Sequence, residues 1–508
     1  MLTRRELGRL AAGGAGAALL GHVGALSASR AGERDGLVTT PIAWTSDDPH
    51  LSGNFAPIGP EIDTADLEVV SGRIPADLSG AYMRNGPNPL FKPISFTYPL
   101  DGDGMIHAVY LDNGRARYKN RFVRTAGLEA ERRAGRAIYG GVMRPVPVDP
   151  KLVGPHGDPG PIKNGCFISV LRHGGHLLAL NEASPCYELS MDLETLGQWT
   201  AGTNAPIDLG AHNRRHPQSG ALFTLAYEVE KPLVHFHQIS ADGTLADTFT
   251  VGLDKPTMIH DFVLTENHIV LLAGPAVFDI EAAMRGESML QWQPDLGMRI
   301  ALIALDGSTI DWLETDAFFV FHFANGFERG GQIFIDYVRH SALHLGYRGA
   351  TGNEAPPRLH RLTIDPVARR VTDVQIAPMT VEFPRVNDAY DALPTRYVYI
   401  PTITDTLRLP DPPSAAFNTI CRVDSDTGDV MRHDFGNRLG GEPVFIPRPG
   451  ATAEEDGYLA VFAYDPATET SDFVLLDAAH VDADPVAVIR LPQRVPQGLH
   501  GTWIPKDR

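Results

Sequence analysis

From about residue 60 to its end, the chain alternates short apolar segments with tight turns. Many segments are rich in β-branched and aromatic residues and show partial period-two alternation, which predicts strands. The predicted strands span residues 108–111, 177–180, 221–227, 268–273, 300–304, 332–337, 397–400 and 457–462. Helical periodicity is rare, and short peripheral helices are expected at residues 127–136 and 279–285.

Turn dipeptides recur between the predicted strands and supply the positive φ angles that hairpins need. These pairs are Asn113-Gly114, Gly174-Gly175, Asp242-Gly243, Asp306-Gly307 and Thr427-Gly428. Strand clusters repeat about every 50–65 residues, which is the scale of a propeller blade. The 50 glycines and 40 prolines also fit a loop-rich all-β chain. The pattern favours a β-propeller, with a sandwich or several jelly rolls as competing architectures.

The first thirty residues differ from the rest and predict a signal peptide. Arg4-Arg5 precedes a weakly apolar run over residues 10–26, with small residues around 25–28. Paired arginines with modest hydrophobicity favour twin-arginine export, and the alternative is a chance Arg-Arg in an amphipathic or disordered N-terminus. We therefore expect a leader over residues 1–30 and a single domain over residues 31–508, located in the bacterial periplasm or secreted.

The composition, 43% hydrophobic and 21% charged, is typical of a soluble globular protein. The net charge of −18 argues against nucleic-acid binding, which needs a basic surface. No stretch after the leader approaches 18 consecutive apolar residues, so no transmembrane helix is expected. The three cysteines allow at most one disulfide, so the fold cannot depend on a disulfide framework.

Most of the nineteen histidines are expected to be surface groups or satisfied core groups. Four lie in distinctive contexts: His212 in GAHN, His260 in MIHDF, His322 in FHFAN and His500 in GLHGT. Their separations of 48, 62 and 178 residues are close to one, one and three blade lengths. Side chains at one radial position on different blades would converge on the propeller axis, and convergent imidazoles suit iron, zinc or copper.

Further motifs accompany these histidines along the chain. They are RNGPNP at 84–89, DGDGMI at 101–106, NRFVRT at 120–125 and GEPVF at 441–445. With these motifs the sequence resembles the carotenoid cleavage oxygenase family, which includes bacterial stilbene- and isoeugenol-cleaving enzymes. The resemblance implies a seven-bladed β-propeller with Fe(II) on its axis, capped on the active-site face by short helices and loops.

The resemblance also assigns the residues around the iron. It implies four ligands, His212, His260, His322 and His500. It implies three supporting carboxylates, Glu182, Glu382 and Glu442, which orient His260, His322 and His500 in that order. Such carboxylates accept the ligand N–H bond and fix the tautomer of the ring. His212 is left without a carboxylate partner.

Two positions depart from the family pattern. Asn213 follows the first ligand where the family has proline, and His216 stands where Asp-Pro is common, which makes His216 the alternative to His212. In many members a threonine crowds one open iron position, and Ile168 occupies that place in this sequence.

The implied activity is dioxygen-dependent cleavage of a conjugated carbon–carbon double bond to two carbonyl products. The partners are then O2 and an apolar conjugated molecule, expected to be a carotenoid or apocarotenoid. A stilbenoid or phenylpropanoid is the alternative substrate. An inactive propeller that acts as a binding protein is the second alternative.

Substrate contacts are expected from a lysine and several aromatic residues. Stilbene-cleaving relatives hold a phenolic hydroxyl with a lysine and a tyrosine, and Lys119 matches the lysine, whereas the tyrosine has no match near Leu90-Phe91. An apolar tunnel is expected to include four phenylalanines: Phe91, Phe96, Phe321 and Phe323. Residues 138–153 are a candidate for peripheral membrane contact.

Overall fold

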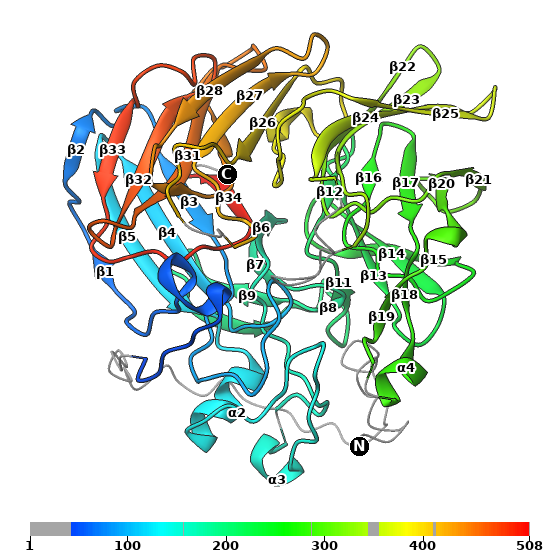
Figure 1. The fold of residues 1–508 in the computed structure, drawn as a ribbon, viewed down its shortest axis with the longest axis horizontal. Coiled ribbons are helices and arrows are strands. Elements are labelled where there is room, and N and C mark those ends of the chain that lie inside the picture. The colour runs from blue at the N-terminus through cyan, green and yellow to red at the C-terminus, as the bar shows by residue number, and fades with distance from the viewer. Residues whose placement is uncertain (1–41, 156, 286, 344–354, 410–412, 507–508) are drawn as a thin grey trace.

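Seven small antiparallel sheets stand as blades around a common centre and form a β-propeller (Figure 1). This computed structural model describes residues 42–155, 157–285, 287–343, 355–409 and 413–506, and the blades are counted within them. The all-β propeller predicted from the sequence is therefore confirmed. The leader predicted over residues 1–30 lies outside the described residues.

Apart from the C-terminal strand β34, the strands of four blades come from the N-terminal two-thirds of the chain. The first contains, across the sheet, β1 (Asp63–Thr64), β5 (Arg115–Phe122), β4 (Met105–Asp112), β3 (Gly80–Arg84) and β34 (Gly501–Pro505). The second contains β10 (Thr195–Gln198), β9 (Tyr187–Leu189), β7 (His176–Leu180) and β6 (Ser169–His173). The third contains β12 (Arg214–Arg215), β13 (Leu222–Tyr227), β14 (Leu233–Ile239) and β15 (Leu245–Gly252). The fourth contains β16 (Val263–Leu264), β17 (His268–Ala273), β20 (Met298–Ala304) and β21 (Ile310–Thr315).

The remaining three blades complete the ring. The fifth contains β22 (Phe323–Arg329), β23 (Gln332–Arg339), β24 (Arg358–Asp365) and β25 (Arg370–Gln375). The sixth contains β26 (Tyr397–Thr402), β27 (Thr419–Asp424) and β28 (Val430–Asp434). The seventh contains β2 (Val69–Gly72), β33 (Ala487–Arg490), β32 (Thr470–Asp477), β31 (Gly457–Asp465) and β29 (Leu439–Gly440), and β30 (Val444–Pro447) also pairs with β31. Two ribbons accompany the blades: β8 (Ser184–Pro185) with β11 (Asp208–Leu209), and β18 (Ala276–Phe278) with β19 (Leu290–Trp292).

The eight strands predicted from the pattern all fall on observed strands, because their turns and alternation are local signals. Asn113 and Gly114 join β4 to β5 with φ angles of 50° and 73°, as a hairpin dipeptide should. Gly307 joins β20 to β21, where a Cβ atom would lie 2.5 Å from the ring of Phe249. Glycine is therefore required at that turn both for its positive φ and for space.

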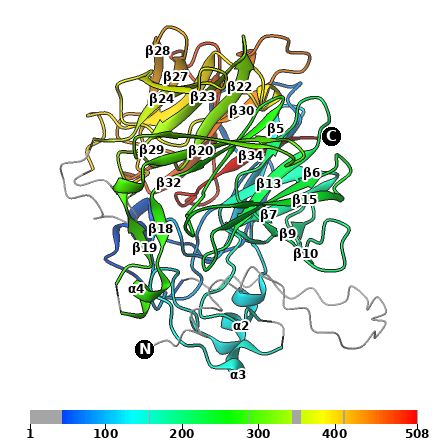
Figure 2. The ribbon, with the colours of Figure 1, turned by 90° about the vertical axis from the view of Figure 1, so that its right-hand side faces the viewer.

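Both predicted helices are present. They are α2 (Ala126–Ala134), where Thr125 Oγ1 caps the N-terminus by accepting from Leu128 N, and α4 (Ile280–Met284), capped in the same way by Asp279. A third short helix, α3 (Pro150–Val153), follows α2. Both views place these three helices at the same end of the molecule, beyond the blades (Figures 1 and 2).

The segment predicted to contact a membrane, residues 138–153, lies against this helical end. Ile138, Tyr139 and Val153 are buried together with Ala130 of α2, so their apolar surface faces the protein rather than the solvent. No helix among the described residues is long and apolar enough to cross a membrane.

The ring is closed by the two ends of the chain. The C-terminal strand β34 pairs with β3, placing Trp503 opposite Tyr82. The buried Tyr82 ring lies 5.3 Å from the ring of Phe473 in β32, measured between centroids. This aromatic contact joins the first blade to the seventh through the largest apolar cluster of the core.

Replacing Phe473 by alanine should therefore loosen the closure. Phe473 is fully buried, and removing a buried phenylalanine costs about 3–5 kcal/mol of unfolding free energy. Denaturant or thermal unfolding measures the loss, with Val367→Ala as control, because Val367 is 94% exposed. Equal unfolding midpoints for the two variants would contradict this account of the closure.

Candidate metal centre

The four histidines singled out by the sequence each stand one to three residues before an edge strand of a different blade. His212 precedes β12, His260 precedes β16, His322 precedes β22 and His500 precedes β34. Contacts between β12 and β16 and between β16 and β22 bring these edges together around the axis. The blade architecture thus converts four widely separated sequence positions into one cluster.

The ligand atoms of these four rings all lie within 4.8 Å of one another. Nε2 of His212 is 3.1 Å from Nε2 of His260, and Nε2 of His322 is 3.1 Å from Nε2 of His500. Two nitrogens that each lie about 2.1 Å from one ion, at right angles, would be about 3.0 Å apart. The spacing therefore fits neighbouring ligands of a single metal ion.

Three glutamates hold three of these rings from outside. Nδ1 of His260 lies 2.7 Å from Oε2 of Glu182. Nδ1 of His322 lies 2.5 Å from Oε2 of Glu382, and Nδ1 of His500 lies 2.9 Å from Oε1 of Glu442. The pairing is the one that the resemblance implies, and no carboxylate contacts His212 among the described residues.

These hydrogen bonds fix the tautomers of the rings. A neutral imidazole that donates Nδ1–H to a carboxylate carries its lone pair on Nε2. His322 and His500 then point two lone pairs at each other across 3.1 Å, where neither nitrogen can donate. Convergent imidazole nitrogens fit a divalent transition-metal cation, and the lone pairs of His322 and His500 would repel each other without it.

The carboxylates are themselves held by groups that the sequence did not single out. The Tyr227 hydroxyl donates to Oε1 of Glu182. Nε2 of His340 lies 2.9 Å from Oε1 of Glu382. Glu442 accepts from Gly501 N at 2.8 Å and lies 3.5 Å from Arg385. Tyr227 and His340 stand at strand ends with no local motif, so only their tertiary contacts reveal them.

The pKa shifts of Glu382, His212 and His500 favour an ionised carboxylate and neutral rings at these positions, whereas the shift of His260 has the opposite sign. Burial alone would raise the pKa of Glu382, but His322 and His340 outweigh it and hold this pKa well below its ordinary value. Burial lowers the pKa of His500 and, together with the neighbouring rings, holds the pKa of His212 far below its usual value. His260 is also buried, yet Glu182 raises its pKa.

One ion pair links three of the segments that carry ligands. Arg214 Nη2 lies 2.6 Å from Oδ2 of Asp261, and Arg214 Nε donates to the carbonyl of Phe262 at 3.0 Å. The same Asp261 oxygen accepts from the backbone N of Phe323 at 3.1 Å. Residues adjacent to His212, His260 and His322 are therefore tied to one carboxylate.

The structure brings His212 into the cluster rather than the alternative, His216. His216 Nδ1 contacts Ser219 Oγ at 2.9 Å, and its Nε2 lies 3.1 Å from the backbone oxygen of Glu266. Ile168 lies beside the centre, since its carbonyl accepts from His500 N at 3.1 Å and the residue lines the adjoining cavity.

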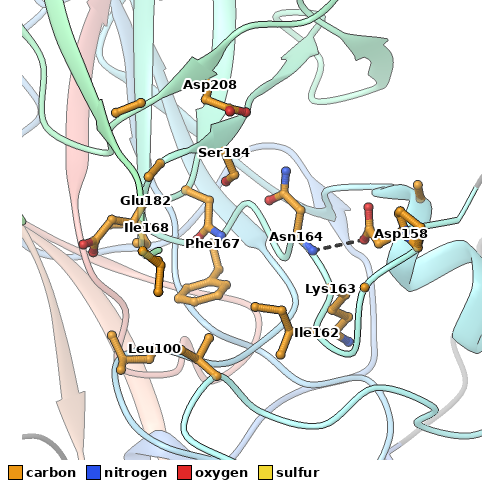
Figure 3. Close-up of a pocket in the computed structure, with 18 of the residues that line it drawn as sticks. Leu100, Asp158, Ile162, Lys163, Asn164, Phe167, Ile168, Glu182, Ser184 and Asp208 are labelled. Atoms are coloured by element: carbon orange, nitrogen blue, oxygen red, sulfur yellow. Dashed lines mark hydrogen bonds between the residues drawn. The ribbon is translucent and has the colours of Figure 1, made fainter. Parts of the chain in front are cut away.

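A cavity of about 860 Å³ adjoins the centre at Glu182 and Tyr227 (Figure 3). Apolar side chains line part of it: Leu100, Met143, Ile162, Phe167, Ile168 and Met258. A cavity of this size and lining suits a small apolar molecule. Lys163 also lines the wall, and its ammonium group pairs with the carboxylates of Asp103 and Glu131.

The phenylalanines predicted to contact the substrate lie in three different places. The Phe321 ring lies 5.5 Å from that of His260, at the metal centre. Phe91 and Phe96 line a second, smaller pocket, which shares Phe167 with the main cavity. Phe323 is buried with Tyr337 in the core of its blade and does not line the cavity beside the metal centre.

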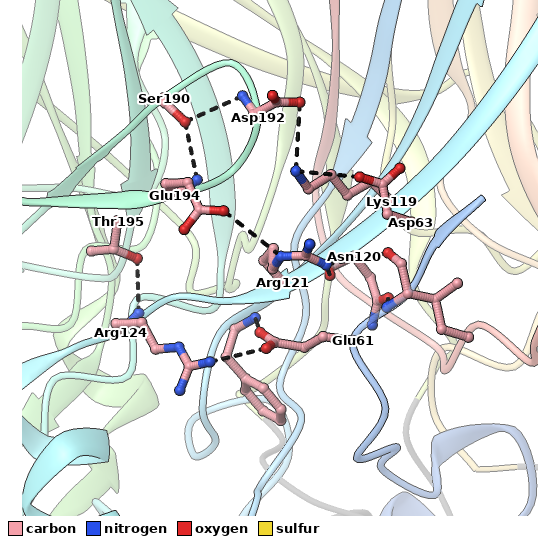
Figure 4. Close-up of polar contacts among 12 residues, drawn as sticks. Glu61, Asp63, Lys119, Asn120, Arg121, Arg124, Ser190, Asp192, Glu194 and Thr195 are labelled. Carbon is pink, nitrogen blue, oxygen red and sulfur yellow. Dashed lines mark hydrogen bonds and ion pairs between the residues drawn. The ribbon is translucent and has the colours of Figure 1, made fainter. Parts of the chain in front are cut away.

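Lys119 is not brought to the cavity either. It is buried in β5, with Nζ 3.6 Å from an Asp63 oxygen and 3.5 Å from an Asp192 oxygen (Figure 4). It does not belong to the residues that line the cavity beside the metal centre. The described contacts make Lys119 part of a salt-bridge network between β1, β5 and the loop at Asp192.

With the geometry in place, sequence comparison identifies the family. The chain matches the retinal pigment epithelial membrane protein family, RPE65, over residues 55–505. It is 29% identical over 510 residues to carotenoid 9,10(9',10')-cleavage dioxygenase 1 of Pisum sativum, with 93% of each chain covered. It is 32% identical to apocarotenoid-15,15'-oxygenase of Synechocystis over 86% of this chain and 92% of that one. The chain belongs to this family of carotenoid cleavage oxygenases.

Solved structures agree with this assignment. The lignostilbene dioxygenase of Pseudomonas brassicacearum superposes with a TM-score of 0.82 at 28% identity, covering 91% of this chain and 99% of that one. A cobalt-substituted apocarotenoid oxygenase of Synechocystis gives a TM-score of 0.79 at 30% identity, covering 89% and 97%. Relatives that act on carotenoids and on stilbenes therefore share this fold.

The glutamates behind the ligands give a direct test of the centre. Glu382→Gln should weaken metal binding about 10- to 100-fold, because loss of an outer carboxylate disturbs ligand basicity and orientation. Titration of metal-free protein with Fe(II) or Co(II) measures this affinity. Glu328→Gln is the matched control, because Glu328 makes a similar pair with a histidine that is not part of the centre: its Oε1 lies 3.0 Å from Nδ1 of His268. Unchanged affinity in Glu382→Gln would contradict the assigned role.

Proposed function

We propose that this protein is a non-heme Fe(II) oxygenase that cleaves a conjugated double bond of a carotenoid or apocarotenoid to carbonyl products. The observation that carries the proposal is the cluster of four histidine nitrogens within 4.8 Å, oriented so that their lone pairs converge. His212, His260, His322 and His500 would hold the ion. Glu182, Glu382 and Glu442 would orient three of them.

The donor set supports iron. Four neutral imidazoles would leave a divalent ion its full charge, and imidazole is a suitable ligand for iron. Held by these four rings, Fe(II) would supply the activation of dioxygen towards the alkene. The solved structure of a cobalt-substituted relative indicates that, in that protein, cobalt can replace another metal.

The chain itself would position the substrate and exclude water from the centre. Phe167, Ile168 and Met258 present apolar surface beside the centre, which favours an apolar polyene and excludes water. Glu382 and Glu442 accept the N–H protons of His322 and His500, so these rings keep their Nε2 lone pairs directed inward. The residues thus hold the alkene and the ion in place without forming a covalent bond to the substrate.

A stilbenoid or phenylpropanoid is the second candidate substrate. It is supported by the superposition on a lignostilbene dioxygenase and by a cavity large enough for either molecule. The position of Lys119 removes one argument for a phenol, because that lysine already contacts Asp63 and Asp192.

An assay distinguishes these readings from a binding protein. Fe(II)-loaded protein is incubated in air with an apocarotenal and, separately, with a hydroxystilbene, and aldehyde products are measured. Cleavage of the apocarotenal is expected, and aldehyde from neither substrate with iron bound would favour a binding protein. His500→Ala should lose iron and turnover together. The control is His360→Ala, which removes a ring on β24 that pairs with Asp373, and this variant should keep both iron and turnover. Retained turnover in His500→Ala would contradict the ligand assignment.

We also propose export through the twin-arginine route, which is supported by Arg4-Arg5 and the weakly apolar run that follows. Replacing both arginines by lysine should leave the protein in the bacterial cytoplasm at its full length. Fractionation of cells and N-terminal sequencing of the exported protein test this. Unchanged export of the double variant would contradict the route.

A further inference from the structure

Asp208 stands at one end of the cavity and takes no part in the metal centre. It belongs to β11, which pairs with β8 so that Asp208 lies opposite Pro185 and Leu209 opposite Ser184. Ser184 follows Glu182 by two residues, so this ribbon continues directly from the segment that supports His260. Figure 3 places Asp208 and Ser184 towards one end of the cavity, and Leu100 and Ile162 towards the other.

The carboxylate of Asp208 lacks a partner. Among the described residues no hydrogen bond or ion pair reaches it, and burial alone raises its pKa to about 8. Asp208 is half-buried in the cavity wall. A carboxylate that loses water without gaining a partner is costly, and proteins ordinarily pair such groups or neutralise them. Asp208 therefore lines the cavity as a polar group whose hydrogen-bonding capacity is unused.

Basic side chains along the same wall already have acidic partners. Lys163 pairs with Asp103 and Glu131, and Arg124 lies 2.9 Å from Glu61. His235 contacts Glu228 at 3.1 Å. These pairs leave Asp208 to interact with whatever occupies the cavity.

The neighbouring polar atoms favour a ligand that donates a hydrogen bond. Asn181 Oδ1 and Ser184 Oγ, in the segment around Glu182, are buried and have no hydrogen-bond partner. Both residues line the cavity. The amide oxygen can only accept and the serine hydroxyl can accept or donate, which suits a ligand hydroxyl, while Leu100, Ile162 and Phe167 make other parts of the wall apolar.

We infer that Asp208 binds a hydroxyl group at one end of the substrate and thereby selects hydroxylated conjugated alkenes. A hydroxyl can donate to the ionised carboxylate and can also accept from the protonated acid, so it suits Asp208 in either state. The inference rests on the proposed function, since it names a feature of the molecule that the same cavity would hold. Asp208 acts here as a specificity residue that contacts the substrate away from the bond that is cleaved.

A site that hydrogen-bonds a hydroxyl discriminates against the analogue that lacks it, because the buried polar group is then left unpaired. The wild-type protein should bind a hydroxylated ligand about tenfold more tightly than its hydrogen analogue. Two ligand pairs test this under anaerobic conditions, a 3-hydroxy-apocarotenal with its deoxy analogue and 4-hydroxystilbene with stilbene. Dissociation constants come from absorbance or fluorescence titration, and preference within one pair identifies the hydroxyl as alcoholic or phenolic.

Asp208→Leu should remove this preference by weakening only the hydroxylated ligand, with affinity for the deoxy analogue unchanged or higher. Asp208→Ala, which adds no bulk, serves if the leucine variant gives no soluble protein. Asp247→Leu is the control, because Asp247 is exposed on β15. Metal content is measured in every variant to show that the centre is intact.

Equal loss of affinity for both members of a pair, no loss, or no preference in the wild type would each overturn the inference. Failure of the proposed function is recognised separately, because binding is measured without turnover. A wild-type protein that prefers the hydroxylated ligand through Asp208 but cleaves neither ligand in air would retain this inference and refute the oxygenase.

Discussion

Repulsion between imidazole lone pairs at the propeller axis is the constraint on which the rest of the structure depends. His322 and His500 both donate Nδ1–H to carboxylates, so their Nε2 lone pairs face each other across 3.1 Å, which is unfavourable unless a cation lies between them. His212 and His260 approach equally closely at the same centre. The rings must therefore be fixed from outside. Carboxylates at 2.5–2.9 Å fix three of them, and the blades fix the backbone from which all four extend.

A propeller meets this constraint because its edge strands lie at equivalent places around one axis. The ligands come from four blades, so no single hairpin determines the geometry of the centre. Asp261 ties three ligand segments together through Arg214 and Phe323 N. The fourth segment is held separately, by Arg385 donating to Gly501 O at 3.0 Å and by Glu442 accepting from Gly501 N. Ring closure between β34 and β3 is thus a condition for placing His500.

The sequence predicted what depends on local order and on motifs. Hairpin turns such as Asn113-Gly114 and the cap at Thr125 are decided by neighbouring residues, so the strands and helices were found. Tertiary contacts were not accessible in this way. Lys119 was assigned to substrate, but its partner Asp192 comes from another blade. Phe321 contacts the metal centre and Phe323 the core of its blade, because β22 begins only at Phe323 and the period-two alternation of a strand does not apply to the pair. Tyr227, His340 and Asp208 carry no motif at all.

The two kinds of carboxyl group near the cavity show how the protein distributes the cost of buried charge. Glu182 receives Tyr227 and His260, and Glu382 receives His322 and His340, so each buried charge in the centre has at least two donors. Within the described part of the chain the Asp208 carboxylate has none, and burial raises its pKa to about 8. Leaving such a group unpaired when a ligand excludes water from it costs about 1–3 kcal/mol. The glutamates behind the ligands have their hydrogen-bond donors, whereas the unpaired Asp208 carboxylate lies in the cavity wall. The partner of Asp208 is therefore best sought in the molecule that the cavity binds.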